Sequence, residues 1–298
     1  MSKRRSYLSY IATRRGVIKM TFDIKGSVEF VIFDMDGLLR LASSPQQYDM
    51  PDESSWLIPV IRRRFTRSSP VSRTNTILGR YGYNMTWAIK AGVMGKPGRP
   101  AAEYIFAQFP GLDQHITVEE YMRESAELQA EYFKTVEPMR GAVNLVRGLY
   151  DNGVPIALAS GSSLANFKVK SSHLSHIFSL FPPTSILTAD SPEVPSGRGK
   201  PFPDIYLAAA RSLGRNVGTP ESCDDAQRAE RAKGIVFEDA VPGVHAGVAA
   251  GMNVIWVPDP QLRAIKPKED YGAKQVLPSL EEWDPTAWGS KPLPKSII

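Results

Sequence analysis

Five short runs rich in valine, isoleucine and phenylalanine recur along the chain, and helical patterns separate several of them. Each run is apolar at consecutive positions, as expected of a strand that a parallel sheet buries on both faces. Strands that alternate with helices predict an α/β fold with a doubly wound, Rossmann-like parallel sheet. The predicted strands cover residues 28–34, 154–160, 185–189, 234–238 and 253–258, and the clearest helices cover residues 142–152 and 204–213.

The spacing of the first two predicted strands indicates an inserted domain. More than a hundred residues separate them, which is too many for one crossover connection. Residues 74–137 carry a helical pattern with apolar faces, so we expect a small helical cap domain there, over a core formed by residues 28–40 and 138–298. Residues 1–27 are expected to be a disordered basic extension, and residues 41–73 form an atypical segment where the chain enters the cap.

Composition and charge exclude several classes of protein. No run of eighteen apolar residues occurs, so no membrane span is expected. The net charge is +5, but residues 1–73 hold thirteen Lys and Arg against seven Asp and Glu, whereas the rest of the chain holds twenty-three against twenty-four. The body is therefore nearly neutral. Its basic residues are not interleaved with aromatic residues as in a nucleic-acid channel, so no nucleic-acid partner is expected.

The single cysteine and the first residues bear on location. Cys223 cannot form a disulfide within the chain, which favours a reducing, cytoplasmic setting. The first twenty-two residues are basic and contain no acid, so a mitochondrial transit segment is an alternative. The sequence gives no indication of the oligomeric state.

Two carboxylates, Asp34 and Asp36, stand two residues apart at the end of the first predicted strand. Side chains at this spacing on an extended segment point the same way, and Gly37 allows the chain to turn sharply just beyond them. Such a pair suits an aspartate nucleophile with a neighbouring acid and base. A strand that ends in a polar turn has the same pattern, so distant parts of the chain must decide between the two interpretations.

Other predicted strands also end in polar residues. Ser160 ends the second strand, and the acidic pair Glu238 and Asp239 ends the fourth. Ligands of such sheets bind beyond the carboxyl ends of the strands, so we expect these side chains to meet Asp34 at one crevice. Taken alone, Ser160 would be a turn residue and the acidic pair would cap the following helix.

Four motifs in this order resemble those of the haloacid dehalogenase-like hydrolases. They are Asp34-Met35-Asp36-Gly37, the hydroxyl-bearing Ala159-Ser160-Gly161-Ser162, Gly199-Lys200-Pro201-Phe202-Pro203-Asp204, and Val236-Phe237-Glu238-Asp239-Ala240. The likeness extends from Phe30 to about Leu293. Because each motif falls where the predicted sheet needs it, the four together are more specific than any one of them.

The resemblance implies a magnesium-dependent phosphatase. Asp34 would be the nucleophile and a Mg²⁺ ligand, and Glu238 and Asp239 would complete the metal site. Asp36 would give its backbone carbonyl to the metal. Its side chain would protonate the leaving oxygen and then deprotonate the water that opens the aspartyl-phosphate. This acid distinguishes the phosphatases and phosphomutases of the superfamily from the dehalogenating branch.

The resemblance also implies the phosphate contacts. The hydroxyl of Ser160 and the backbone N–H of Gly161 would donate to phosphoryl oxygens, and Lys200 would offset their charge. Without the resemblance, Lys200 beside two prolines would be interpreted as a solvated loop residue.

Further segments resemble the capped branch that contains pseudouridine-5'-phosphatases and glycerol- or sugar-phosphate phosphatases. They are Met85-Thr86-Trp87, Ile89-Lys90-Ala91, Met94-Gly95-Lys96 and residues 251–259. By this resemblance Lys96 contacts the substrate from the cap; an exposed lysine at a helix end is the alternative. The predicted partner is a small phosphorylated metabolite, such as a pseudouridine 5'-phosphate-like nucleotide or a sugar phosphate. Glycerol- or polyol-phosphate hydrolysis and sugar phosphomutase activity are the alternatives.

The segment from Arg40 to Arg73 departs from the family pattern, which continues after D-x-D-G-L-L with an acidic stretch and a helix. It falls where the family places the cap hinge, and a loop of this length in a compact domain is uncommon. Either it is a true insertion, or it is translated non-coding sequence in the gene model, which sequencing the mature transcript would decide. A true insertion predicts weaker cap closure. It also leaves open a catalytically impaired binding protein.

Overall fold

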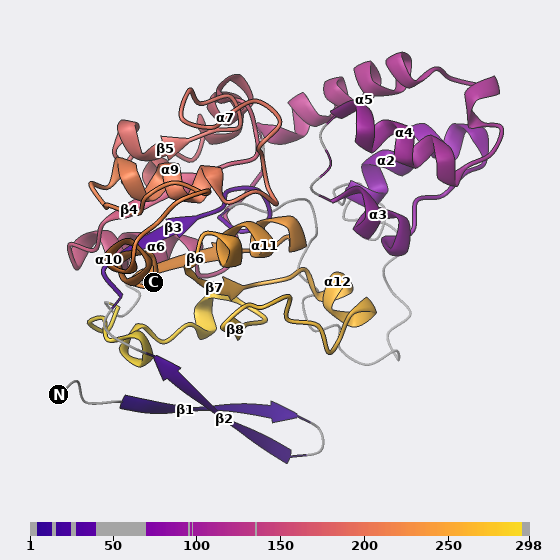
Figure 1. The fold of residues 1–298 in the computed structure, drawn as a ribbon. Coiled ribbons are helices and arrows are strands. Elements are labelled where there is room, and N and C mark those ends of the chain that lie inside the picture. Colours follow the sequence, from indigo (N-terminus) through magenta and orange to yellow (C-terminus); the bar gives the residue numbers. More distant parts are fainter. Residues whose placement is uncertain are drawn as a thin grey trace.

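The centre of the protein is a six-stranded sheet in the order β5-β4-β3-β6-β7-β8, in which all neighbours are parallel (Figure 1). The structure is a computed structural model that describes the chain except for residues 1–4, 14–15, 25–27, 40–69, 95, 97, 135 and 294–298. All five predicted strands are present, and the predicted α/β fold is confirmed. The strands are β3 (Phe30–Phe33), β4 (Ile156–Ala159), β5 (Ile186–Leu187), β6 (Gly234–Glu238), β7 (Asn253–Trp256) and the unpredicted β8 (Gln275–Val276).

Both faces of the sheet are buried because alternate side chains of the central strands enter two different hydrophobic cores. In β3, Val31 and Phe33 belong to one core, whereas Phe30 and Ile32 belong to the other. This alternation explains why the strand is apolar at every position. Helices α6 (Ala142–Asp151), α7 (Leu164–Ser171) and α8 (Ser175–Phe178) cover the first core, and α9 (Asp204–Ser212), α11 (Val241–Ala249) and α12 (Pro260–Ile265) cover the second.

The remaining elements of the body are short. They are α10 (Asp225–Arg231) and the 3₁₀ turns η3 (Pro183–Ser185), η4 (Leu280–Glu282) and η5 (Pro285–Trp288). None of the helices in the described ranges is long and apolar enough to cross a bilayer.

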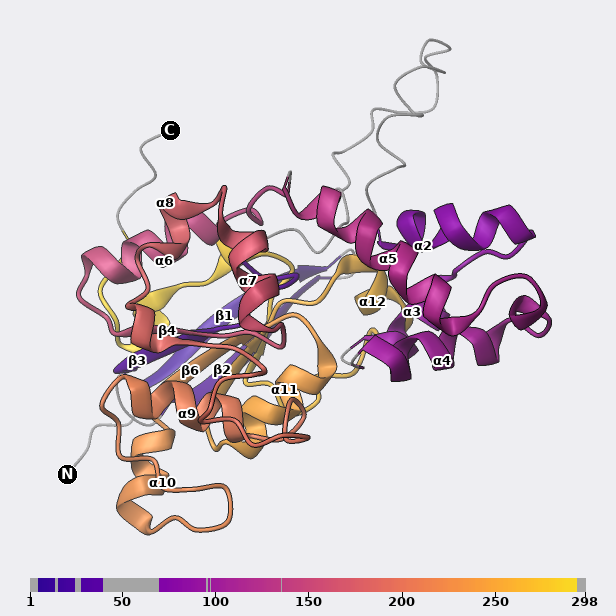
Figure 2. The same ribbon diagram turned by 90° about the horizontal axis from the view of Figure 1, so that it is seen from above.

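A helical unit with its own core stands beside the α/β body. It contains α2 (Pro70–Leu78), η1 (Gly79–Tyr81), α3 (Trp87–Val93), α4 (Gly98–Gln108), η2 (Leu112–Gln114) and α5 (Val118–Phe133). Leu78, Ile105 and Leu112 are among the side chains buried within it. Figure 2 shows these helices together on one side of the sheet, where α3 lies against α12 and α5 approaches α7.

The atypical segment is described only at its end. Helix α2 begins at Pro70, so the last four residues of the predicted segment 41–73 belong to the helical unit. The rest of that segment lies outside the described residues.

Near the N-terminus the structure differs from the prediction. Strands β1 (Arg5–Thr13) and β2 (Gly16–Ile24) form an antiparallel pair, so the expectation of disorder is wrong for these residues (Figure 1). From Ile18 to Ile24 the sequence alternates apolar and polar residues, which is a strand signal. The basic composition of residues 1–27 drew attention away from this alternation.

Candidate active site

The strand order brings the predicted polar residues to one edge of the sheet. Strand β3 lies between β4 and β6, and the backbone N–H of Asp34 donates to the carbonyl of Phe237 at 3.0 Å. Asp34 therefore lies beside Glu238. On the other side, the register of β3 with β4 brings Ser160 to the same edge. Buried parallel strands thus hold residues together that stand more than a hundred positions apart in the chain.

Lys200 joins two of the acids. Its ammonium donates to Oδ1 of Asp34 and to Oε1 of Glu238, each at 2.6 Å. The side chain of Lys200 is 12 % exposed and that of Glu238 is 1 % exposed, so water screens these ion pairs little. Removing one partner of a buried ion pair leaves a buried charge without compensation, which strongly destabilises the folded protein.

Glu238 is held by four donors. Besides Lys200, the hydroxyl of Tyr206 donates to Oε1, and the backbone N–H groups of Asp239 and Ala240 donate to Oε2 at 3.0 and 3.1 Å. A carboxylate has about four lone-pair directions, so the protein engages all of them. The sequence analysis missed Tyr206, which stands in a uniformly apolar stretch of α9 and gives no signal of its own.

Gly243 of α11 gives Glu238 the room to sit there. A Cβ atom at this position would lie 1.7 Å from Oε1 of Glu238 and 1.9 Å from its Cδ, which no packing permits. The sequence analysis missed this residue too. Its signal was a glycine inside a helix, which costs about 1 kcal/mol relative to alanine and so indicates a packing reason.

Asp34, Glu238 and Asp239 form a compact group of three buried carboxylates. Each offers an oxygen within 4.8 Å of the others. Oδ1 of Asp239 is buried and accepts no hydrogen bond from any described residue. An all-oxygen donor set with one buried oxygen still unpaired fits a hard divalent cation such as Mg²⁺. Asp36, the fourth predicted ligand, does not bring its carboxylate into this group.

Burial and mutual repulsion alter the protonation of these acids. Burial, reinforced by the charges of Glu238 and Asp36 and opposed by Lys200, raises the pKa of Asp34 to about 7. Burial also raises the pKa of Asp239 well above its usual value, and the neighbouring acids add to the effect. Burial alone would lower the pKa of Lys200, but the charges of Asp34 and Glu238 outweigh it, so the ammonium form is stabilised.

Asp36 points to a second cluster. Its Oδ2 accepts from Lys170 of α7 at 2.7 Å and from the hydroxyl of Ser162 at 2.9 Å. The side chain of Asp36 is 31 % exposed, whereas that of Lys170 is 8 % exposed. Gly37 follows with φ of 92°, so the sharp turn that the sequence predicts is present. The sequence analysis missed Lys170, which resembles any surface lysine of a short helix.

Ser160 and Gly161 form the turn after β4. The Ser160 side chain is fully buried, and its Oγ accepts from the backbone N–H of Ser162 at 3.1 Å. Because that hydroxyl acts as an acceptor there, its own proton can be donated to a ligand. Gly161 is exposed at the rim.

Among the described contacts, none joins Lys96 to the acids, and its predicted contact with the substrate stays a prediction. Lys96 is exposed in the helical unit, and its ammonium lies 5.5 Å from the ring centroid of Tyr104. The two residues that flank Lys96 lie outside the described ranges.

With this geometry the chain can be compared with known proteins. A family model described as haloacid dehalogenase-like hydrolase matches residues 28–251. The chain belongs to this family. Within it, the chain is 34 % identical over 222 residues to a probable pseudouridine-5'-phosphatase of Saccharomyces cerevisiae, covering 72 % of this chain and 87 % of the relative. It is 32 % identical over 272 residues to (DL)-glycerol-3-phosphatase 2 of Arabidopsis thaliana, covering 91 % and 95 %.

A solved structure supports the fold. A family hydrolase of Deinococcus radiodurans, crystallised with bound phosphate and sodium, aligns with a TM-score of 0.60 at 22 % identity, covering 90 % of this chain and 100 % of that one. The resemblance stated from the motifs is thus confirmed. The predicted enzyme class, a phosphoric monoester hydrolase, is confirmed as well, because the matching family is one of hydrolases and the named relatives are phosphatases.

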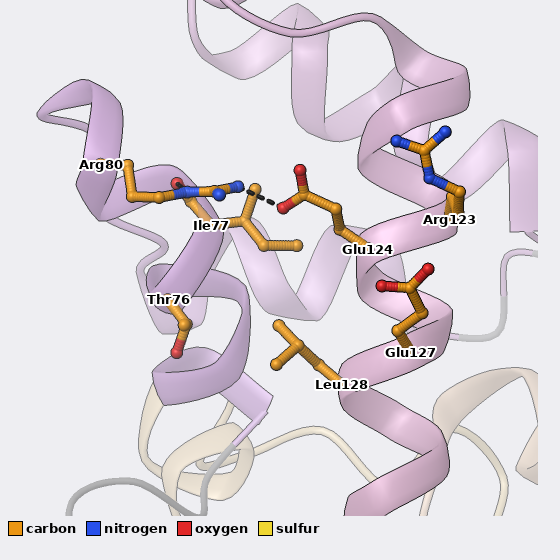
Figure 3. Close-up of a pocket in the computed structure, with 7 residues that line it drawn as sticks. All are labelled: Thr76, Ile77, Arg80, Arg123, Glu124, Glu127 and Leu128. Atoms are coloured by element: carbon orange, nitrogen blue, oxygen red, sulfur yellow. Dashed lines mark hydrogen bonds and ion pairs between the residues drawn. The ribbon is translucent and has the colours of Figure 1, made fainter.

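A separate pocket of about 620 Å³ lies in the helical unit between α2 and α5 (Figure 3). Figure 3 shows Arg80 of the turn after α2 reaching Glu124 of α5, to which it donates a hydrogen bond. None of the predicted site residues lines this pocket. The acids at the end of the sheet are therefore the candidate active site of the hydrolase, and the pocket is not. Its lining residues are Thr76, Ile77, Arg80, Arg123, Glu124, Glu127 and Leu128.

Proposed function

We propose that the protein is a Mg²⁺-dependent phosphatase that hydrolyses a small phosphomonoester through an aspartyl-phosphate on Asp34. The observation that carries this proposal is the buried group of Asp34, Glu238 and Asp239. Lys200 lies between two of them, and no described residue donates to Oδ1 of Asp239. The large majority of buried polar atoms in proteins have a hydrogen-bond partner, and a bound ion is one explanation for an oxygen that has none.

In the first step an oxygen of Asp34 attacks phosphorus and the bond from phosphorus to the ester oxygen breaks. Asp36, in its protonated form, gives its proton to that leaving oxygen, and the alcohol departs. The phosphoryl group is then bound to Asp34 as an acyl phosphate. Proton donation at this point is needed because an alkoxide is a poor leaving group.

In the second step Asp36, now a carboxylate, takes a proton from water as that water attacks phosphorus. The bond from phosphorus to the Asp34 oxygen breaks, and inorganic phosphate leaves. Asp36 finishes the cycle protonated and Asp34 finishes it ionised. One water is consumed for each alcohol and phosphate released, so the atoms and charges balance.

Asp34, Asp239 and the backbone carbonyl of Asp36 would hold Mg²⁺, which when bound screens the phosphoryl charge from the attacking carboxylate. Two unit charges about 4 Å apart repel by about 4 kcal/mol at a moderate effective dielectric, so this screening matters. Glu238 adds its charge to the site. Direct ligation by Glu238 would require it to release one of its four present donors.

Ser160, Gly161 and Lys200 bind the transferred group. The hydroxyl of Ser160 and the backbone N–H of Gly161 donate to phosphoryl oxygens, and Lys200 offsets the negative charge that they share with Asp34. Lys200 is already fixed by two carboxylates, so little reorganisation is needed when the phosphoryl group arrives.

For the alcohol part, a pseudouridine 5'-phosphate-like nucleotide or a sugar phosphate is the first candidate, and glycerol 3-phosphate is the alternative. The names of the yeast and plant relatives support these two classes. A panel of both esters and a hexose phosphate should be assayed with Mg²⁺ and with EDTA, measuring free phosphate and any isomerised sugar phosphate. Isomerised product without free phosphate would identify a mutase instead.

Asp34→Asn is the decisive variant. Loss of phosphate release in this variant, together with Mg²⁺-dependent release by the unaltered protein, is the expected result. Substantial turnover by a folded Asp34→Asn protein would remove Asp34 from the role of nucleophile. Lack of turnover by the unaltered protein across the panel would favour the catalytically impaired binding protein.

The location proposed for this phosphatase is the cytoplasm, with the mitochondrion as the alternative. One relative of Arabidopsis thaliana that is 33 % identical over 267 residues is named a mitochondrial glycerol-3-phosphatase. Microscopy of the full chain fused at its C-terminus to a fluorescent protein separates the two locations.

A further inference from the structure

Lys170 of α7 lies between the helical unit and the acid Asp36. Its ammonium donates to Oδ2 of Asp36 and to Oγ of Ser162, both at 2.7 Å. Ser162 in turn donates to the same carboxylate oxygen at 2.9 Å. The three groups form a closed triangle of hydrogen bonds around one oxygen, which fixes the orientation of the carboxyl group.

The same ammonium contacts the last residue of α5. The ring centroid of Phe133 lies 4.6 Å from Nζ of Lys170, within the range of a cation–π interaction. Helix α5 is the last helix of the helical unit before the chain returns to the body. Lys170 therefore links Asp36, which follows β3, with α5, the last helix of the helical unit.

Burial makes this link strong and sensitive. Lys170 is 7 % exposed, and a lysine is almost never buried to that extent without a paired charge. In such an environment a charge-assisted hydrogen bond is stronger than in water, and removing one member leaves the others poorly satisfied. A buried lysine whose long side chain ends on the carboxylate of a catalytic acid thus needs a reason beyond packing.

We propose that Lys170 is a positioning residue. With Ser162 it holds the Asp36 carboxyl group where that group can transfer a proton, and through Phe133 it makes the orientation of the carboxyl group depend on the position of α5. This inference rests on the proposed function, because it concerns the acid of that reaction. Proton transfer requires the acid within hydrogen-bond reach of the leaving oxygen. A carboxyl group free to rotate would meet that condition only part of the time.

The test compares substrates that differ in their need for a proton. An alkyl phosphate such as glycerol 3-phosphate needs acid assistance to leave, whereas p-nitrophenyl phosphate releases a stable anion and needs little. The ratio kcat/KM reports the steps up to formation of the phosphoenzyme. For Lys170→Met we expect kcat/KM to fall about 100-fold with the alkyl phosphate, the lower end of what general acid catalysis contributes. With the aryl phosphate it should fall only a few-fold.

Lys168→Met is the matched control. Lys168 lies on the same helix and is exposed, so this variant removes the same charge from the same element without touching Asp36. Its kcat/KM should equal that of the unaltered protein with both substrates. The Mg²⁺-induced rise in Tm should be the same in both variants, because neither lysine belongs to the metal site.

Two further variants test the parts of the link. Ser162→Ala should show the same substrate selectivity with a smaller loss, and it keeps the test decisive if Lys170→Met does not fold. Phe133→Leu keeps the ion pair but removes the ring. Its loss with the alkyl phosphate should not add to that of Lys170→Met in the double variant, because both act through one orientation of Asp36.

The outcomes separate this inference from the proposed function. Equal losses with both substrates, or a Lys170→Met variant that behaves like Lys168→Met, would overturn the positioning role while leaving the phosphatase intact. Additive effects of Phe133→Leu and Lys170→Met would overturn the link to α5. No phosphate release by the unaltered protein from either substrate would overturn both the function and this inference.

Discussion

Replacing Gly243 by alanine tests the proposed arrangement of the site without touching a charged group. The added Cβ would lie 1.7 Å from Oε1 of Glu238. The Glu238 side chain is 1 % exposed and is held by four donors. Glu238 cannot move aside without losing some of them. The backbone of α11 cannot retreat freely either, because Val244 and Ala246 are buried in the core beside it.

The magnitude follows from the bonds at risk. A hydrogen bond to a charged group contributes about 1.5–3 kcal/mol, and alanine is favoured over glycine in a helix by about 1 kcal/mol. If Glu238 gives up two of its donors, the free energy of unfolding should fall by about 2–5 kcal/mol after the helix gain is included. Lys200 would lose one of its two carboxylates, so phosphatase activity should fall as well.

Urea denaturation gives the free energy of unfolding, and the Mg²⁺-induced rise in Tm reports the metal site. Gly79→Ala is the matched control, because a Cβ there meets nothing within 4 Å. The control should be neutral or slightly stabilising. A Gly243→Ala protein with the stability, Mg²⁺ response and activity of the control would refute the reasoning that this glycine exists to admit Glu238.

Three other predictions concern the charges of the site. The pKa of Asp34 is raised to about 7 from 3.8, so between these pH values the folded metal-free protein holds a proton that the unfolded chain has released. The free energy of unfolding should therefore fall as pH rises from about 5 to 7, by at most about 1.4 kcal/mol per pH unit. Urea midpoints in EDTA that stay flat or rise over this range would contradict this prediction. Asp239→Asn should abolish the rise in Tm caused by Mg²⁺, since a ligand that binds only the native state stabilises it, and should leave Tm in EDTA nearly unchanged; thermal denaturation with and without Mg²⁺ measures both. Lys200→Met should lower the free energy of unfolding by about 3–5 kcal/mol near pH 7.5, because it leaves Asp34 beside Glu238 without a counter-charge. The loss should be smaller near pH 5, where Asp34 can be protonated. An equal loss in urea denaturation at both pH values would argue against this origin.

The edge of the sheet could be predicted from the sequence because its residues follow strongly apolar strands. Asp34, Ser160 and Glu238 each end such a run, and parallel strands leave little freedom in how their ends meet. Lys200 could be assigned only through its motif, since it reaches Asp34 across 166 positions from a loop with no periodicity. The family and the enzyme class followed from these same residues and are confirmed.

What the sequence left out depends on packing between elements. Tyr206 and Lys170 come from short helices whose buried faces are fixed only once the sheet exists, and neither residue type indicates a role there. Ser162 stood in a quoted motif, but its bond to Asp36 joins residues 126 positions apart. The hairpin of β1 and β2 was missed for a different reason: composition was weighed above an alternation that was visible.

The way the helical unit joins the body has a consequence for how such an enzyme can change. Among the described elements, the helices of this unit from α2 to α5 all fall between β3 and β4 in sequence, and these two strands are neighbours in the sheet. Exchanging that unit for another of different shape would require only two new junctions. Asp34, Glu238 and Asp239 all lie outside this unit, so chimaeras that exchange it leave the acids of the candidate site unaltered.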